Sequence, residues 1–332
     1  MTAARTAAGS RWIDSINAEL RPRRPRRPLV LDLFASCGGL ALGFEAVGFR
    51  TIGYELSETA AHTYEENLLG KCHVEKLHIG CTLPSAPVIV GGPPCQPFSN
   101  GGKRRASQDE RDGFPAFLDA VDRIKPDLAI IENVRGLTVG DRRPYFLETL
   151  ETLRRFGYTV ETMDLNAAEY GVPQRRHRVF IVAHRGGFKA PVTSATEVSV
   201  GAALGDLLVE DPPEPRWLTP GQDAYIARYE KASQCRRPRD LDLDQPARTL
   251  TCRNLAGATG DMLRIRLADG RRRRVEVREA ARLQSFPDWF EFSGSLRSQF
   301  QQIGNAVPPL LARAVAQSAA KYLLSLRSHL AA

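Results

Sequence analysis

The sequence predicts an α/β protein with a doubly wound, mostly parallel sheet and a smaller, irregular domain that contains β-structure. Between residues 28 and 183, short apolar runs of strand length alternate with segments of helical periodicity. This alternation is typical of a sheet with helices on both faces. After His184 the chain becomes rich in Pro, Arg and Asp, and its periodicity weakens. A chain of 332 residues is long enough for two domains of unequal size.

The predicted elements follow one another at short intervals. Strands are expected at 28–34, 49–54, 87–90, 128–131, 159–165 and 179–183, and helices at 40–47, 114–124 and 145–156. Gly48 can end the first of these helices, and Ser57 can cap the start of another. Further along, a β-hairpin is predicted at 263–267 and 273–277, and an amphipathic helix at 311–330.

Three reactive side chains directly follow predicted strands: Glu55, Cys95 and Glu132. In open parallel sheets, ligands bind outside the carboxyl ends of the strands. The three side chains are therefore expected to share one crevice.

The formal charge of +8 is concentrated in two arginine runs, at residues 21–27 and 271–274. Such runs suit contacts with phosphate groups. For the proline-interrupted run, a solvated and disordered arm is the alternative. Residues 1–27 are expected to form a flexible, basic leader, and residues 271–274 could equally be a charged turn.

Six scattered cysteines do not resemble a disulfide scaffold, so free thiols in a reducing compartment are expected. There is no apolar stretch of about 20 residues, and the first residues do not resemble a signal peptide. We expect a cytoplasmic protein, near the nucleoid, without contact with a membrane. Cys72-His73 and His78-x-x-Cys81 fit no common zinc spacing, so no metal is expected.

Two segments carry candidate chemistry. Between Asp32 and Gly39 the predicted first strand turns into a helix, and glycines there let a ligand approach the backbone. Together with Glu55 this pattern indicates a nucleotide-like ligand, or merely a tight turn. The segment from Gly91 to Ser99 holds Cys95 between prolines, so Cys95 is either a nucleophile or a buried structural cysteine.

Four ordered motifs resemble the DNA cytosine-5 methyltransferase family of prokaryotes. They are Gly92 to Ser99, Glu132 to Val134, Gln174 to Arg178 and Gln302 to Pro308. The resemblance runs from about residue 29 to the C-terminus and implies the fold of methyltransferases that use S-adenosylmethionine. It implies a catalytic domain at 28–185 plus 303–332, and a target-recognition domain with a hinge at 186–302.

The resemblance also implies roles for the residues of these motifs. Cys95 would attack C6 of a cytosine that is flipped out of duplex DNA. Glu132 would hold or protonate N3 with a raised carboxyl pKa, Arg178 would hold O2, and Arg176 would support the same region. C5 would then take the methyl group, which leaves S-adenosylhomocysteine as the second product.

The cofactor site implied by the resemblance comprises Phe34, Gly38, Gly39, Leu40, Glu55, Leu56, His78, Ile79, Pro94, Phe114 and Asn305. Two residues depart from the family pattern. Ser36 stands where glycine is usual, and it fits if its φ is negative. His78 stands before Ile79 where an Asp is usual, which affects the expected contact with adenine.

Expected DNA contacts are Ser99, Lys103, Arg104, Arg105, Arg236, Arg237 and Arg253, with the loop at 100–111 closing over the duplex. Arg239 and residues 271–274 are further candidates for base or phosphate contacts. Duplex DNA is the expected partner of a monomeric enzyme, and a separately acting restriction endonuclease is a further candidate partner. Two alternatives stay open: a tRNA cytosine methyltransferase, although its Cys-Phe-Thr signature is absent, and an inert DNA-binding relative.

Overall fold

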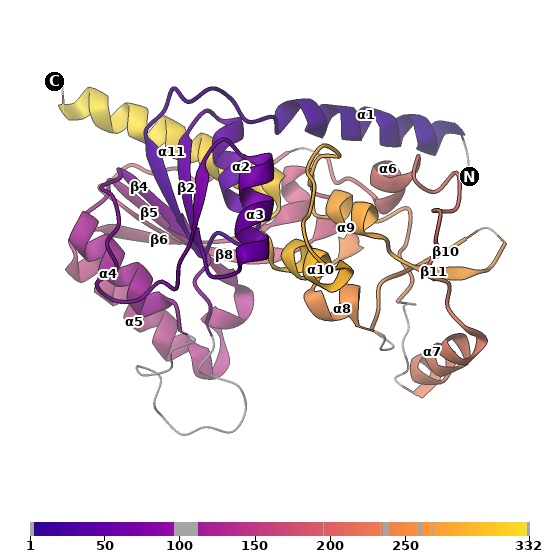
Figure 1. The fold of residues 1–332 in the computed structure, drawn as a ribbon. Coiled ribbons are helices and arrows are strands. Elements are labelled where there is room, and N and C mark those ends of the chain that lie inside the picture. Colours follow the sequence, from indigo (N-terminus) through magenta and orange to yellow (C-terminus); the bar gives the residue numbers. More distant parts are fainter. Residues whose placement is uncertain are drawn as a thin grey trace. The chain divides into compact units, whose positions relative to one another are not determined.

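A computed structural model describes residues 3–95, 112–194, 196–232, 234, 239–257, 261–267 and 269–330 (Figure 1). The chain divides into two compact units. The first, here called the sheet unit, comprises Leu20–Asn166, His177–Thr193 and Pro309–Ala332. The second, the hairpin unit, comprises Met1–Glu19, Ala167–Arg176 and Ser194–Pro308.

The sheet unit is built on a seven-stranded sheet in the order β3-β2-β1-β4-β5-β8-β6. β1 to β5 and β6 run in the same direction, and β8 is antiparallel to both of its neighbours. The strands are β1 Leu29–Leu33, β2 Arg50–Glu55, β3 Lys71–Val74, β4 Val88–Gly91, β5 Leu128–Val134, β6 Thr159–Asn166 and β8 His177–His184. The predicted doubly wound, mostly parallel sheet is thus confirmed.

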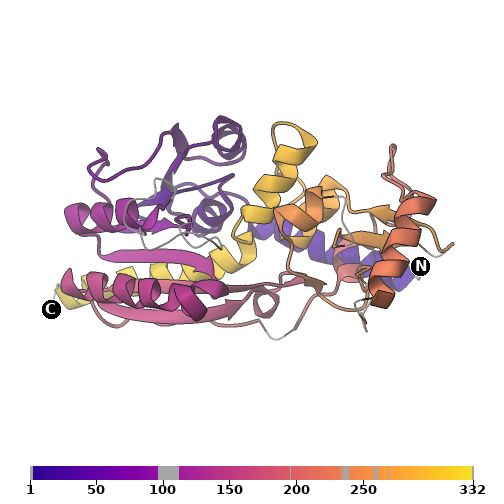
Figure 2. The same cartoon turned by 90° about the horizontal axis from the view of Figure 1, so that it is seen from below.

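The central strands are apolar because both faces of the sheet are covered. Every residue of β1 and β4 is buried, as expected for parallel strands between layers of helices. The helices of this unit are α2 Gly39–Ala46, α3 Glu58–Asn67, α4 Phe114–Ile124, α5 Arg143–Arg155 and α11 Pro309–Leu330. α2 packs against α11, and α4 lies beside α5 (Figure 2).

The caps expected from the sequence are present. Ser57 accepts a hydrogen bond from the backbone of Ala60 at the start of α3. Gly48 follows α2 with a φ of 92°, a conformation that glycine adopts without strain. The strand predicted at 128–131 continues to Val134, because β5 pairs with β8 as far as Arg178. Glu132 therefore lies within a strand.

The hairpin unit contains short elements: α1 Ala3–Glu19, β7 Gln174–Arg175, α6 Val200–Leu204, α7 Pro220–Ala232, β9 Ala247–Arg248, α8 Cys252–Ala256, β10 Arg264–Arg266, β11 Arg272–Arg274, α9 Val277–Leu283 and α10 Leu296–Asn305. β10 and β11 form the predicted hairpin, with shorter strands than expected. Charged residues help to form the interior of this unit. Arg264, which is fully buried, pairs with Asp240 and Glu230, and Arg282 pairs with Asp206 and Asp288.

The expectation of a flexible leader at residues 1–27 is wrong. Residues 3–19 form α1, in which Ile13 and Ile16 are buried. The side chain of Asn17 accepts a hydrogen bond from the backbone of Asp288, and its carbonyl accepts one from the indole of Trp289. Tertiary contacts of an apolar helix stripe therefore order this segment. The arginines and prolines that follow it in the sequence had favoured the expectation of a flexible arm.

Across the part of the chain that the structure describes, no helix is long and apolar enough to span a membrane. Within the same part, no group of three or more His, Cys, Asp or Glu side chains is arranged to hold a metal ion.

The packing of α2 on α11 requires a residue without a side chain at position 43. A Cβ atom on Gly43 would lie 2.4 Å from the backbone nitrogen of Arg313 and 2.5 Å from the Cβ of Ala312. We expect Gly43→Ala to lower the free energy of unfolding by about 1–3 kcal/mol, as measured by urea denaturation. Gly136→Ala is the matched control, since a Cβ there has no atom within 4 Å. Equal stability of the two variants would contradict this account of the packing.

Candidate active site

The turn before Cys95 is held at two carbonyl groups. β4 ends at Gly91, and Gly92, Pro93 and Pro94 lead to the cysteine. The carbonyl of Pro93 accepts a hydrogen bond of 2.9 Å from the side chain of Asn133 in β5. The carbonyl of Pro94 accepts one of 3.0 Å from the backbone nitrogen of Gly113, at the start of α4. The neighbouring strand and helix thus fix the position of Cys95.

The surroundings of the Cys95 thiol influence its ionisation. Cys95 packs against the core cluster that includes Phe114, and it is partly buried. Burial raises the pKa of the Cys95 thiol, the positive charge of Arg142 lowers it, and the negative charge of Asp112 raises it again. The hydroxyl of Tyr145 donates a hydrogen bond to Asp112, so Tyr145 also belongs to the surroundings of the thiol. Asp112, Arg142 and Tyr145 were not predicted, because no local pattern links them to Cys95.

Glu132 and Arg178 form an ion pair of 2.8 Å, and both side chains are only 11% exposed. They come from the paired strands β5 and β8. A Cβ placed on Gly92 would lie 3.2 Å from Oε2 of Glu132, so the carboxylate borders the turn that carries Cys95. Burial lowers the pKa of the Arg178 guanidinium and Glu132 opposes that effect. The structure therefore brings Glu132 and Arg178 together beside the turn before Cys95, at one edge of the sheet.

The turn between β1 and α2 has left-handed backbone at three residues, Phe34, Ser36 and Gly38. A Cβ on Gly38 would lie 2.4 Å from Leu68 and 2.7 Å from Tyr64, so only glycine fits there. The condition under which serine would fit without strain, a negative φ, is not met, since the φ of Ser36 is 51°. The strain of this conformation is offset by the Ser36 backbone nitrogen, which donates a 2.8 Å hydrogen bond to Glu55.

Glu55, the last residue of β2, links the cofactor candidates. Its second oxygen accepts a 2.9 Å hydrogen bond from the backbone of Ser57, so both oxygens are oriented by backbone groups. Leu56 and Ile79, which follow β2 and β3, are 64% and 65% exposed although they are large and apolar. The ring of His78 turns back to the carbonyl of Ile79 at 2.8 Å.

The remaining cofactor candidates of the sheet unit lie close to the Cys95 turn. The rings of Phe34 and Pro94 both approach Gly113, since a Cβ there would lie within 2.7 Å of each. Phe114 is fully buried and packs edge-on against Tyr145, with ring centroids 5.4 Å apart. Gly39 and Leu40 begin α2 and are buried.

Two predicted site residues, Arg176 and Asn305, belong to the hairpin unit. Arg176 is buried and donates to three carbonyls, those of Leu250 at 2.6 Å, Gly304 at 3.0 Å and Ala306 at 3.1 Å. This arrangement makes Arg176 a positioning residue for the two segments that it joins. Asn305 accepts a hydrogen bond from the thiol of Cys252 at 3.0 Å.

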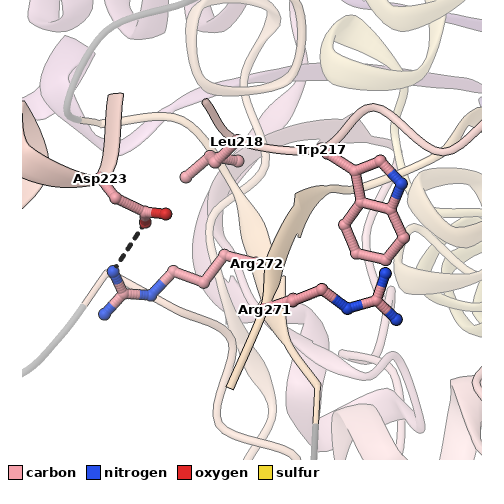
Figure 3. A pocket seen from close by; sticks show the side chains of 5 residues that line it. All are labelled: Trp217, Leu218, Asp223, Arg271 and Arg272. Atoms are coloured by element: carbon pink, nitrogen blue, oxygen red, sulfur yellow. Dashed lines mark hydrogen bonds and ion pairs between the residues drawn. The ribbon is translucent and has the colours of Figure 1, made fainter. Parts of the chain in front are cut away.

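The arginines of residues 271–274 are engaged within the hairpin unit. Arg273 is buried with Glu279, and Arg274 donates to the carbonyls of Leu255 and Gly257. Figure 3 shows a pocket in which Arg272 pairs with Asp223 and Arg271 lies against the ring of Trp217, 4.1 Å from its centroid. Contacts of this run with bases or phosphates stay a prediction, and in the structure these side chains have partners within the unit.

The other predicted DNA contacts differ in whether their side chains are exposed, paired within the protein or outside the described residues. Arg253 is exposed near the start of α8. Arg239, in contrast, pairs with Asp261. Ser99, Lys103, Arg104, Arg105, Arg236 and Arg237 lie outside the described residues.

The fold is that of a methyltransferase. A solved structure of the Entamoeba histolytica methyltransferase EhMeth matches it with a TM-score of 0.69 at 17% identity, over 91% of this chain and 99% of that one. A Spodoptera frugiperda DNMT2 mutant matches with a TM-score of 0.66 at 16% identity, over 88% of this chain and 99% of that one.

Sequence comparison defines the family. Residues 29–321 match the family described as C-5 cytosine-specific DNA methylase, and the chain belongs to this family. The Type II methyltransferase M.AplI of Arthrospira platensis is 54% identical, over 87% of this chain and 85% of its own. M.XorII of Xanthomonas oryzae pv. oryzae is 32% identical, over 87% and 84%. The protein is a DNA cytosine-5-methyltransferase of the kind found in restriction–modification systems.

The charges around Cys95 predict how its thiol responds to pH. Because the pKa of the Cys95 thiol is raised, its alkylation by iodoacetamide should become fast only at a higher pH than the alkylation of an ordinary thiol. At a fixed pH below the thiol pKa, Asp112→Asn should speed alkylation and Arg142→Gln should slow it, each by about two- to tenfold. Cys95→Ala gives the background of the other cysteines, and Tyr145→Phe controls for loss of the Tyr145–Asp112 bond. A shift in the same direction in both charge variants would contradict this assignment.

The buried pair of Arg273 and Glu279 predicts a loss of stability on substitution rather than a loss of DNA contact. Arg273→Met leaves the Glu279 carboxylate buried without its partner, which should lower the free energy of unfolding by about 3–5 kcal/mol. The exposed Arg266, in the same hairpin, is the control, and Arg266→Gln should change stability by less than about 0.5 kcal/mol. Thermal unfolding of both variants tests the difference, and an Arg273→Met protein as stable as the control would refute it.

Proposed function

We propose that the enzyme transfers the methyl group of S-adenosylmethionine to C5 of a cytosine flipped out of duplex DNA, with Cys95 as a covalent nucleophile. The observation that carries this proposal is the Cys95 turn bordered by the Glu132–Arg178 pair on neighbouring strands. A thiol, a carboxylate and a guanidinium at one edge match the three positions of cytosine that such a reaction must engage: C6, N3 and O2.

The residues have separate tasks in the proposed reaction. The Cys95 thiolate adds to C6, and the electron pair of the C5–C6 double bond moves to C5 and into the ring. Glu132 holds N3 and supplies a proton as negative charge develops there, while Arg178 donates to O2. C5 forms the new bond to the methyl carbon as the bond between that carbon and the sulfonium sulfur breaks, so that S-adenosylhomocysteine is the leaving group. A base then takes the proton from C5, the double bond returns, the bond between C6 and Cys95 breaks, and the proton on N3 goes back to Glu132.

The Glu132–Arg178 pair also indicates what must change when a base binds. An ion pair stabilises the ionised carboxylate, whereas donation to N3 requires its protonated form. When O2 of the base takes one donor of Arg178, the pair loosens, and Glu132 can share a proton with N3. The pair thus keeps both side chains oriented until a cytosine arrives.

The proposed cofactor site is the carboxyl edge around the β1–α2 turn. S-adenosylmethionine supplies an electrophilic methyl group when bound. Glu55 suits its ribose, because its backbone hydrogen bonds fix both oxygens while each retains a lone pair. The exposed Leu56 and Ile79 suit the adenine faces. Glycines at 38 and 39 let the backbone at the start of α2 approach the methionine end, beside Phe34 and Pro94.

Further parts of the proposal concern the partner molecules. Residues of the hairpin unit, among them the exposed Arg253, would contact the duplex and select its sequence. Ser99 and the basic residues 103–105 would contact the same DNA. A cognate endonuclease would act separately on the same sequence, and one active site suffices for each flipped base, so a monomer is the proposed working state.

Sequencing of 5-methylcytosine in DNA from cells that express the protein tests the activity. We expect one recurring methylated sequence with the wild type and none with Cys95→Ala. Glu132→Gln should retain the fold and lower methylation by about two orders of magnitude or more, because it cannot supply the proton. Methylation of tRNA but not of duplex DNA, or equal methylation by wild type and Cys95→Ala, would exclude the proposal.

The covalent step has its own measurement. A duplex with 5-fluorocytosine at the target cannot release its C5 substituent as a cation, so Cys95 should stay bonded to C6. A denaturation-resistant complex is expected with the wild type and S-adenosylmethionine, and none with Cys95→Ala. Methylation of ordinary DNA without any trapped complex would speak for a mechanism other than covalent addition.

A further inference from the structure

Residues 20–28, which join α1 to β1 and are here called the arginine strap, are anchored through their backbone. The backbone nitrogen of Arg23 donates to the carbonyl of Glu45 at 3.0 Å, and those of Arg26 and Arg27 donate to the carbonyl of Gly48 at 3.0 Å. Figure 1 shows this indigo segment at the end of the sheet where β1 and β2 begin. Prolines at 22, 25 and 28 restrict it further. The strap is therefore a fixed element of the sheet unit.

Most strap arginines point their charge to solvent. The side chains of Arg23, Arg24 and Arg26 are exposed, as is that of Arg50, whose backbone bonds to Pro28. None of these four guanidinium groups takes part in a hydrogen bond or ion pair with another described residue. Arg27, in contrast, donates to the carbonyl of Val47. Arg23, Arg24, Arg26 and Arg50 thus present positive charge without an acidic partner among the described residues.

The strap lies at the amino ends of the strands, and the proposed active site lies at their carboxyl ends. The strap borders the amino ends of β1 and β2, where Leu29 pairs with Arg50. Cys95 follows the carboxyl end of β4, and Glu132 lies near the carboxyl end of β5. A strand of five or six residues separates its amino end from its carboxyl end by about 17–20 Å. Charges in physiological salt are screened beyond about 8 Å, so the strap adds little attraction for a duplex held at Cys95.

We propose that the arginine strap binds the phosphate backbone of a second DNA segment, separate from the duplex whose cytosine is methylated. This inference rests on the proposed function, which brings the protein to long DNA. Guanidinium groups match phosphate oxygens in paired hydrogen bonds. The restricted backbone reduces the entropy lost on binding. Once one segment occupies the active site, neighbouring DNA is present at a high effective concentration.

The chemistry of the strap favours DNA over the other polyanions that could meet it. Segments that bind lipid surfaces combine basic residues with apolar or aromatic side chains that enter the bilayer. The strap between residues 21 and 28 contains only Arg and Pro. A regular array of phosphates needs no apolar contact.

A bridging experiment with the full-length protein tests this inference. A long duplex is immobilised, and a labelled short duplex is retained only when a protein molecule holds both. The variant Arg23→Gln/Arg24→Gln/Arg26→Gln/Arg50→Gln should reduce retention by at least about tenfold. It should also lower the salt slope of binding to the long duplex by about three to four. Its methylation rate on the short duplex should stay at the wild-type value.

The matched control removes four exposed charges elsewhere in the sheet unit: Arg154→Gln/Arg155→Gln/Lys321→Gln/Arg327→Gln. It should bridge like the wild type. Four results would overturn the inference. The first is no bridging by the wild type, and the second is equal bridging by the strap and control variants. The third is binding to anionic vesicles by the wild type but not by the strap variant, without bridging of DNA. The fourth is weaker methylation of the short duplex by the strap variant, which would assign the strap to the substrate duplex. Bridging is measured without methyl transfer, so failure of the proposed activity would remain a separate result.

Discussion

Two hydrogen bonds to proline carbonyls determine where Cys95 stands, and the rest of the candidate site depends on them. Consecutive prolines offer no N–H group, so the turn at Pro93 and Pro94 can be held by hydrogen bonds only through its carbonyls. Asn133 and Gly113 provide the two donors. Because Asn133 adjoins Glu132 in β5, the bond that fixes the turn also brings the carboxylate to it. Arg178 follows through its pair with Glu132.

The sheet was predictable because burial on both faces makes its strands apolar runs. β1 and β4 could be located from composition alone, and Glu55, Cys95 and Glu132 from their places after such runs. The limits of the strands were less predictable, because they depend on pairing: β5 extends past Ile131 because β8 continues to pair with it. Contacts between distant residues, such as Tyr145 with Asp112, leave no pattern in the sequence.

The two arginine runs look alike in the sequence but differ in the structure. Arg272 and Arg273 find acidic partners in Asp223 and Glu279, from separate segments of the hairpin unit. Arg23, Arg24 and Arg26 have no such partners among the described residues. Net charge therefore indicates that a protein carries basic residues, while only the fold shows which of them remain available to another molecule. Similarly, the buried Ile13 and Ile16 show that a helix can precede a basic run that suggests disorder.

The path of the chain through the hairpin unit constrains how this unit can be exchanged between relatives. The segment Ser194–Pro308 enters as one long insertion, but Ala167–Arg176 belongs to the same unit and is encoded apart from it. Gln174 and Arg176 in that short piece bond to Leu250, Gly304 and Ala306 in the long one. A recombination that replaces only the long segment therefore succeeds only if the incoming segment offers carbonyls at the same places. Exchange of the long segment is thus limited by a decapeptide that is encoded apart from it.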